Sequence, residues 1–240
     1  MHTLISVAGD DPGEGVRAGL QADAEMARGL GVHFLGVVAV DTEQDEGGLH
    51  SVRVRSAEEV EESLQRALVE SVFQGEVSVK TGALGSAAIV ESVARVMREW
   101  PEVSLIVDPV HQASRKHAEA PALLDSEGWQ MMCAELFPLA CLVTPNAKEF
   151  GDGSAYQAAR AVLVTGGDDA QGERVIDTLH QEGEAREFSG ERLVGGDSLH
   201  GTGCRLSTAI ACSLPDRVGL VPAIERGRAA LRAWMQSKLA

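Results

Sequence analysis

The feature that most constrains the fold is a regular alternation of short apolar segments with longer helical patterns. The apolar segments are β-rich, and several end at Gly, Pro or Asn; we expect strands at 4–8, 33–40, 77–81, 105–107, 140–144 and 161–165. Helical spacing predicts helices over 18–30, 57–73, 87–100 and 122–136. This alternation indicates βαβ units with right-handed crossovers, and therefore an α/β fold with a doubly wound, mostly parallel sheet flanked by helices.

The pattern changes after Gly167. Segments 174–179 and 185–188 flank a turn-prone stretch, which predicts an antiparallel hairpin at the edge of the sheet. Helical spacing returns at 206–212 and 222–239. Because no repeat, low-complexity tract or linker interrupts the 240 residues, we expect a single domain over 1–240.

Composition excludes several classes of function. The chain has 21 Lys and Arg against 36 Asp and Glu, and a formal charge of −15 repels nucleic acids and anionic membranes. The opening segment 1–9 lacks a basic start, so we expect neither a signal peptide nor a spanning helix, and a cytoplasmic location. Cys133, Cys141, Cys204 and Cys212 form no C-x-x-C pattern, which argues against zinc and disulfides.

Polar residues follow several of the expected strands. In sheets of this type, ligands bind beyond the carboxyl ends of the strands. Gly9 and Asp10 follow the first strand, Asp108 the fourth, Asn146 to Glu149 the fifth and Gly166-Gly167 the sixth. We therefore expect the functional site at that edge of the sheet.

The segment Gly201-Thr202-Gly203-Cys204 stands directly before a helix of small residues. Backbone N–H groups at a helix N-terminus bind anions, and such donors would suit a phosphoryl group in transfer. The same positive end is expected to lower the pKa of Cys204 and make a thiolate base available near neutral pH. The alternative is a flexible glycine loop followed by a cysteine that is merely small and buried.

Taken together and in this order, these segments resemble the ribokinase superfamily, and within it the hydroxymethylpyrimidine/phosphomethylpyrimidine kinases of thiamine biosynthesis. The resemblance rests on 8–12, 18–23, Val107-Asp108-Pro109, Asn146-x-x-Glu149 and the 201–204 loop. It covers most of the chain. Each motif alone is weak, but five in the right order make coincidence improbable.

The resemblance implies a ribokinase-like kinase that uses ATP and Mg²⁺ to phosphorylate 4-amino-5-hydroxymethyl-2-methylpyrimidine and its monophosphate. We also expect a homodimer. The implied roles are catalysis by Cys204 as base with Gly201 and Gly203, substrate binding by Gln44, Gly9 and Asp23, nucleotide binding by Asn146, Thr165 and Gly167, and metal binding by Glu149 and Asp108.

The chain also departs from the family pattern. Asp10 replaces the usual Ser, the turn at 13–17 is longer and charged, and Thr165 stands where Lys is usual; Arg115, Lys116 or Arg205 are candidates to supply the missing cation. The crossover at 150–160 has room for only a short helix. Two alternatives stay open: a pyridoxal-type kinase, and a relative that binds a pyrimidine or a nucleotide without turnover.

Overall fold

The strands form one continuous mixed sheet. The computed structural model describes residues 1–11, 18–45, 48–111, 121–167, 172–214 and 219–240, with only the backbone at 44, 45 and 48. Across the described residues the sheet has nine strands in the order β3-β2-β1-β4-β5-β6-β7-β8-β9. Their bounds are β1 His2–Asp10, β2 His33–Asp45, β3 Gly48–Val54, β4 Glu76–Thr81, β5 Ser104–Val107, β6 Leu142–Val143, β7 Ala161–Val164, β8 Arg174–Gln181 and β9 Glu184–Glu191.

The centre of the sheet is parallel and both of its edges are antiparallel. Strands β2, β1, β4, β5, β6 and β7 pair in parallel, which confirms the doubly wound core. Strands β8 and β9 form the predicted hairpin beyond β7. Strand β3 was not predicted; it turns back antiparallel on a β2 that runs five residues past its expected end at position 40.

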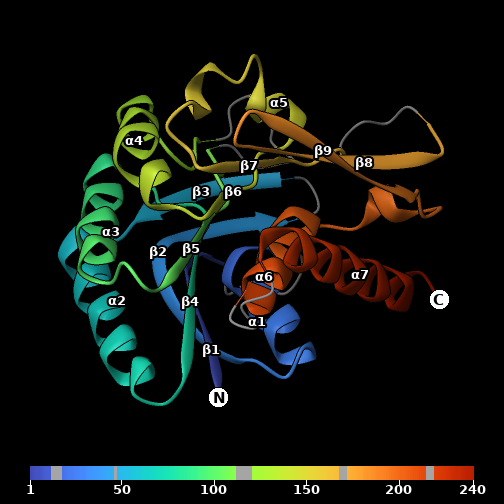
Figure 1. Cartoon of the computed structure of the whole chain (residues 1–240). Helices are drawn as coiled ribbons and strands as arrows, with labels where there is room; N and C mark the ends of the chain where they lie inside the picture. The colour runs from blue at the N-terminus through green and yellow to red at the C-terminus, as the bar shows by residue number, and fades with distance from the viewer. Residues whose placement is uncertain (12–17, 46–47, 112–120, 168–171, 215–218) are drawn as a thin grey trace.

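Helices cover both faces of the sheet (Figure 1). One face carries α1 (Gly19–Gly29), α6 (Thr202–Ser213) and α7 (Leu220–Leu239), while α2 (Ala57–Val72), α3 (Ala87–Glu99) and α4 (Ser126–Met131) cover the other. Successive residues of a strand point to opposite faces, so Leu4 packs into the core under α6 and α7, and Ile5 into the core under α2 and α3. No helix among the described residues is both long and apolar enough to cross a membrane.

The helix expected at 122–136 is shorter and less regular. Asp125 caps α4, its side chain accepting a hydrogen bond from the N–H of Gly128 at 2.7 Å, so the helix begins only at Ser126. The chain continues as a π turn, Met132–Leu136, and a 3₁₀ turn, Phe137–Leu139. Elsewhere the capping box of Ser56 and Glu59 at the start of α2 is confirmed.

The crossover from β6 to β7 contains only short helices, as the sequence indicates. These are α5 (Ala147–Phe150) and a 3₁₀ turn, Ser154–Tyr156. Aromatic rings fill the space beneath them: Tyr156 stacks on Phe137 at 5.1 Å, and Trp129 lies edge-on to both rings. The short crossover therefore has an apolar base of its own.

Candidate functional site

The carboxyl ends of the central strands meet in one row, held by backbone hydrogen bonds between neighbouring strand ends. Gly82 N–H donates to Val7 O at 2.9 Å, Asp108 N–H to Thr81 O at 3.0 Å, Thr144 N–H to Val107 O at 2.9 Å and Thr165 N–H to Pro145 O at 2.8 Å. This row carries the residues that follow β1, β4, β5, β6 and β7. The structure therefore gathers most of the sequence-predicted residues at one edge.

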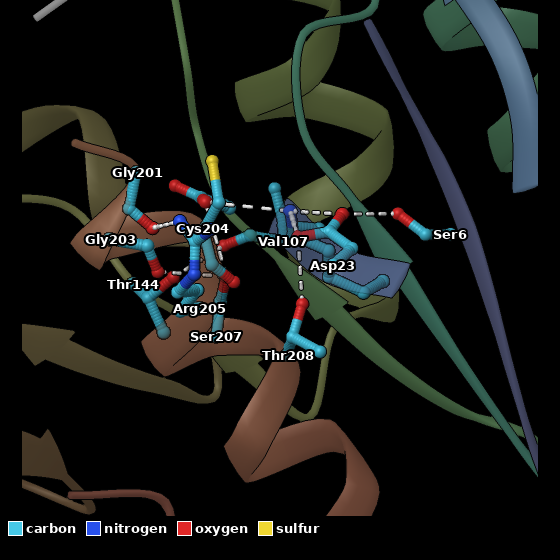
Figure 2. Close-up of polar contacts among 12 residues, drawn as sticks. Ser6, Asp23, Val107, Thr144, Gly201, Gly203, Cys204, Arg205, Ser207 and Thr208 are labelled. Carbon is cyan, nitrogen blue, oxygen red and sulfur yellow. Dashed lines mark hydrogen bonds and ion pairs between the residues drawn. The ribbon is translucent and has the colours of Figure 1, made fainter. Parts of the chain in front are cut away.

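The N-terminus of α6 lies against this row. Gly201 is the N-cap and has φ +68°, a left-handed conformation that favours glycine because a Cβ would be strained there. Ser207, one turn into the helix, donates to Asp108 Oδ2 at 3.1 Å and so fixes α6 to the end of β5. Figure 2 shows Gly201, Gly203 and Cys204 together at this helix end. The first N–H groups of a helix have no partner within it, so this end can bind an anion.

Cys204 does not have the pKa expected from the sequence. Burial raises the pKa of its thiol to about 12; Lys80 opposes the rise, while Asp108 and Asp23 add to it. The expectation of a lowered pKa is therefore wrong for this structure. The cysteine is a thiol at neutral pH here.

Sequence reasoning missed Lys80, which lies fully buried in β4 beside Cys204. Its ammonium donates to both carboxylate oxygens of Asp23, at 3.0 and 2.8 Å, and lies 3.7 Å from Asp108 Oδ2. Burial alone would lower the pKa of Lys80, but Asp23, Cys204 and Asp108 hold it above its ordinary value. A lysine within the apolar run 77–81 was the available signal, because a buried ammonium requires an acidic partner.

Asp23 and Gly9 belong to the packed interior. Asp23 is fully buried on α1, where its carboxylate also accepts hydrogen bonds from Ser6 at 2.6 Å and Thr208 at 2.8 Å. It thus faces protein groups, and its contact with a substrate stays a prediction. Gly9 is buried too, and a Cβ on Gly19 (φ +52°) would collide with its carbonyl oxygen. The start of α1 consequently presses on the end of β1.

The two predicted metal ligands already have protein partners. Asp108 is 6% exposed, and burial raises its pKa while Lys80 opposes the rise. Glu149 accepts a hydrogen bond from the N–H of Asn146 at 2.9 Å, and Asn146 Oδ1 accepts from the N–H groups of Lys148 and Glu149. Asn146 and Glu149 therefore form a capping box for α5. No three His, Cys, Asp or Glu side chains within the described residues are grouped to hold a metal.

The nucleotide residues expected after β7 lie near the capping box. Thr165 forms a parallel bridge with Asn146, which brings the two strand ends together. Gly166 N–H donates to Asp177 Oδ1 at 2.9 Å, and Gly167, which is exposed, accepts from Arg192 Nη1 at 3.4 Å. Thr165 therefore lies beside Asn146 at the strand-end edge, and Gly167 follows Thr165 by two residues.

The remaining sequence-predicted positions have mixed outcomes. Gln44 lies in β2 opposite Leu49, and the structure describes only its backbone. Asp10, whose pKa is raised by burial and by Asp11 and Asp41, lines a pocket of about 560 Å³ beside α1. Residues 13–17, Arg115 and Lys116 lie outside the described residues.

Arg205 is not the compensating cation for the nucleotide. It is 1% exposed, and its guanidinium donates to Glu25 Oε2 at 2.6 Å. A side chain enclosed in this way points into the protein. The cation missing at Thr165 is therefore not supplied by Arg205.

Comparisons with known proteins agree with this architecture. The family model described as phosphomethylpyrimidine kinase matches residues 11–152 and 153–240. The hydroxymethylpyrimidine/phosphomethylpyrimidine kinase of Mycobacterium tuberculosis strain H37Rv is 34% identical, over 94% of this chain and 85% of that protein. The chloroplastic thiamine biosynthetic bifunctional enzyme of Arabidopsis thaliana is 31% identical over 92% of this chain, which spans 44% of the plant protein.

Solved structures show the same fold at lower sequence identity. The phosphomethylpyrimidine kinase of Clostridium difficile superposes with a TM-score of 0.74 at 20% identity, over 98% of this chain and 100% of that one. The pyridoxal kinase of Staphylococcus aureus in complex with pyridoxal gives 0.80 at 21% identity, over 98% and 88%. The expected ribokinase-like fold is confirmed. With nearly its whole length matched, the chain belongs to the phosphomethylpyrimidine kinase family, whose members are phosphotransferases.

Proposed function

We propose that this kinase transfers the γ-phosphoryl group of ATP to 4-amino-5-hydroxymethyl-2-methylpyrimidine and to its monophosphate, within thiamine biosynthesis. The observation that carries the proposal is the family match over 11–152 and 153–240, which includes the Gly201–Cys204 helix end. That end lies against the row of strand ends through the bond from Ser207 to Asp108. A helix end of this kind suits an anionic group in transfer.

The chemistry follows from the groups at that helix end. The hydroxymethyl oxygen of the substrate would form a bond to the γ-phosphorus as the bond to the bridging oxygen of ADP breaks. Negative charge spreads over the oxygens of the transferring group, and the N–H groups at Gly201 to Cys204 stabilise it. Cys204 stands next to these donors. Its thiol holds a proton in the ligand-free protein, so Cys204 would have to lose that proton first, with Lys80 favouring the thiolate, before it accepts the proton of the hydroxyl group. Because such transfers need little covalent chemistry, we expect the donors to contribute more than the base.

The nucleotide and its cation would bind beside the α5 capping box. Asn146, Thr165 and Gly167 are the proposed nucleotide residues, with Glu149 acting through water and Asp108 from the end of β5 as the metal residues. Mg²⁺ takes few protein carboxylates and keeps several waters, so two separate carboxylates fit a cation that arrives with the phosphates. When bound, Mg²⁺ neutralises phosphate charge. Gln44 is the proposed partner of the aminopyrimidine, since an amide offers both a donor and an acceptor.

One assay tests the proposal and its alternatives. ADP release is measured with the pyrimidine alcohol, with its monophosphate and with pyridoxal, each with Mg²⁺ and ATP. Release with the pyrimidine compounds supports the proposal, whereas release with pyridoxal alone favours a pyridoxal-type kinase. Nucleotide binding without ADP release from any of the three would favour a relative that binds its ligands without turnover. The departures from the family pattern at Asp10 and Thr165 are the reason to test this alternative.

Cys204→Ser and Cys204→Ala test the proposed base. The hydroxyl of serine is far less acidic than a thiol, and alanine has no group that could accept a proton, so both variants should keep nucleotide affinity and turn over more slowly. Parental turnover in both would leave catalysis to the backbone donors.

The assembly and location are proposals as well. We propose a cytoplasmic homodimer in which each chain is one domain. Sedimentation at micromolar concentration distinguishes a dimer from a monomer, and limited proteolysis tests the single domain. A monomer in sedimentation would overturn the homodimer.

A further inference from the structure

A buried arginine sits in the first turn of α6, directly after Cys204. Arg205 is 1% exposed and is among the largest fully buried side chains of the described residues. Its neighbours along the helix are small or apolar, so the charge requires specific partners. Figure 2 shows Arg205 beside Gly201 and Cys204. The site described above assigns it no function.

The guanidinium of Arg205 binds the loop that precedes α6. Its Nη1 donates to the carbonyl oxygen of His200 at 3.0 Å and to that of Gly201 at 3.3 Å. The C=O of one residue and the N–H of the next belong to the same planar peptide and point in opposite directions. Because Arg205 binds these two carbonyls, the N–H groups of Gly201 and Thr202 in the same peptides point away from the guanidinium.

The arginine is itself held by two other helices. Its Nη2 donates to Glu25 Oε2 of α1 at 2.6 Å, and Lys238 of α7 binds the other oxygen of Glu25 at 3.0 Å. The guanidinium carbon lies 4.0 Å from the ring centroid of Trp234 on α7, in a cation–π contact. Arg205 therefore joins the loop to α1 and α7 at once.

We propose that Arg205 is a positioning residue for phosphoryl transfer, which fixes the peptide orientation of the 200–202 loop so that its N–H groups face the transferring phosphate. Trp234 and Glu25 keep the guanidinium in place. The inference rests on the proposed function, because that function puts a phosphate at the loop. It concerns peptide orientation, which can also be measured without turnover.

The planar guanidinium is suited to this task. It has five donors in a fixed fork, so it can bind two carbonyls and a carboxylate at the same time. A lysine at this position could bind one or two of these groups but would not stack on Trp234 in the same way. Arg205→Lys should therefore have an intermediate effect, and Arg205→Ala the full effect.

The experiment compares Arg205→Ala, Arg205→Lys and Glu25→Gln with the parent. The matched control is Arg95→Ala, which removes an exposed arginine that binds Glu61 on the opposite helical layer. Steady-state kinetics give kcat and KM at a temperature well below the unfolding midpoint of every variant. In parallel, mass spectrometry follows the rate at which iodoacetamide alkylates each cysteine. Cys204 reports on the loop, and Cys212, at the other end of α6, reports on the helix as a whole.

For Arg205→Ala we expect kcat to fall by about 10- to 100-fold, because misdirected donors stabilise the transition state less, while KM for the alcohol changes by less than about threefold. Alkylation of Cys204 should change by about threefold or more, and that of Cys212 should stay near the parental rate. Glu25→Gln should show the same pattern at smaller size. If Arg205→Ala does not fold, the result for Glu25→Gln decides whether the proposal holds.

Parental kcat and parental Cys204 reactivity in Arg205→Ala, or in Glu25→Gln if that is the variant that folds, would overturn the proposal. So would equal changes at Cys204 and Cys212, which would indicate general loosening of α6, or an equal loss of kcat in Arg95→Ala. If the parent shows no turnover with any pyrimidine alcohol, the proposed function fails instead. The ratio of the alkylation rates of Cys204 and Cys212 then tests only whether Arg205 positions the loop.

Discussion

Removing the ammonium of Lys80 should destabilise the protein strongly. In Lys80→Met the carboxylate of Asp23, which is 0% exposed, loses two hydrogen bonds at 3.0 and 2.8 Å and its closest counter-charge. Ser6 and Thr208 still donate to it, but neutral hydroxyls do not balance a buried charge. Breaking a buried ion pair from one side costs about 3–5 kcal/mol.

A loss of this size is a large share of the total stability of a domain, which is about 5–15 kcal/mol. Urea unfolding followed by circular dichroism should therefore show a much lower midpoint for Lys80→Met. The control is Arg95→Met, whose exposed ion pair with Glu61 contributes about 1 kcal/mol or less. The double variant Lys80→Met/Asp23→Asn should recover a large part of the loss, because the amide is neutral, its oxygen can accept from one of the hydroxyls of Ser6 and Thr208, and its NH2 group can donate to the other.

The result for the double variant decides between two explanations. If an unbalanced carboxylate causes the loss, adding Asp23→Asn restores stability. If instead the loss comes from the shape of the methionine, the two substitutions add. A loss below about 1 kcal/mol in Lys80→Met would refute the reasoning, since exposed pairs have that value.

Three further outcomes are expected. Gln44→Ala should weaken binding of the pyrimidine alcohol by about 1–3 kcal/mol and leave ATP binding unchanged, as calorimetry with a non-hydrolysable ATP analogue would measure; equal losses for both ligands would contradict a specific contact. Glu149→Ala should raise the Mg²⁺ concentration needed for half-maximal activity, and an unchanged Mg²⁺ titration would leave Glu149 as a helix cap alone. Burial raises the pKa of Glu25, but Arg205 and Lys238 outweigh this effect and lower the pKa to about 2. The stabilising effect of Glu25 should therefore be present above pH 4.5 and be lost as the pH falls toward 2. A difference in unfolding free energy between the parent and Glu25→Gln that is the same at pH 6 and pH 3 would contradict this.

Much of the fold could be predicted because its signals are local. The apolar runs and the helical spacing between them predict the parallel centre of the sheet, and the turn at 180–184 predicts the β8–β9 hairpin. Strand β3 was missed because its sequence, GLHSVRV, mixes polar and apolar residues at an edge that is only partly buried. Its pairing with β2 is a tertiary contact, and edge strands carry a weaker apolar pattern than central ones.

The site was less predictable, because its details depend on burial. The helix N-terminus at Cys204 led us to expect a lowered pKa, but a helix end contributes at most about 2 kcal/mol. Full desolvation shifts a pKa by as much as about 3–5 units, which is a larger free energy. Desolvation therefore prevails at Cys204. Sequence gives the helix end, but only the packing around α6 gives the degree of burial.

Helix α1 explains how α6 keeps its orientation. Asp23 and Glu25 are two residues apart on α1, and each binds a buried cation: Asp23 binds Lys80 on the sheet, and Glu25 binds Arg205 on α6. Asp23 also accepts from Thr208 on α6, so α1 holds the first turns of α6 at two points. Donors aimed at a transition state act only when their support is rigid, since a small misplacement lowers the rate steeply. Two of the acidic residues in this strongly acidic chain thus fix α6 to α1, Glu25 through the guanidinium of Arg205 and Asp23 through the hydroxyl of Thr208.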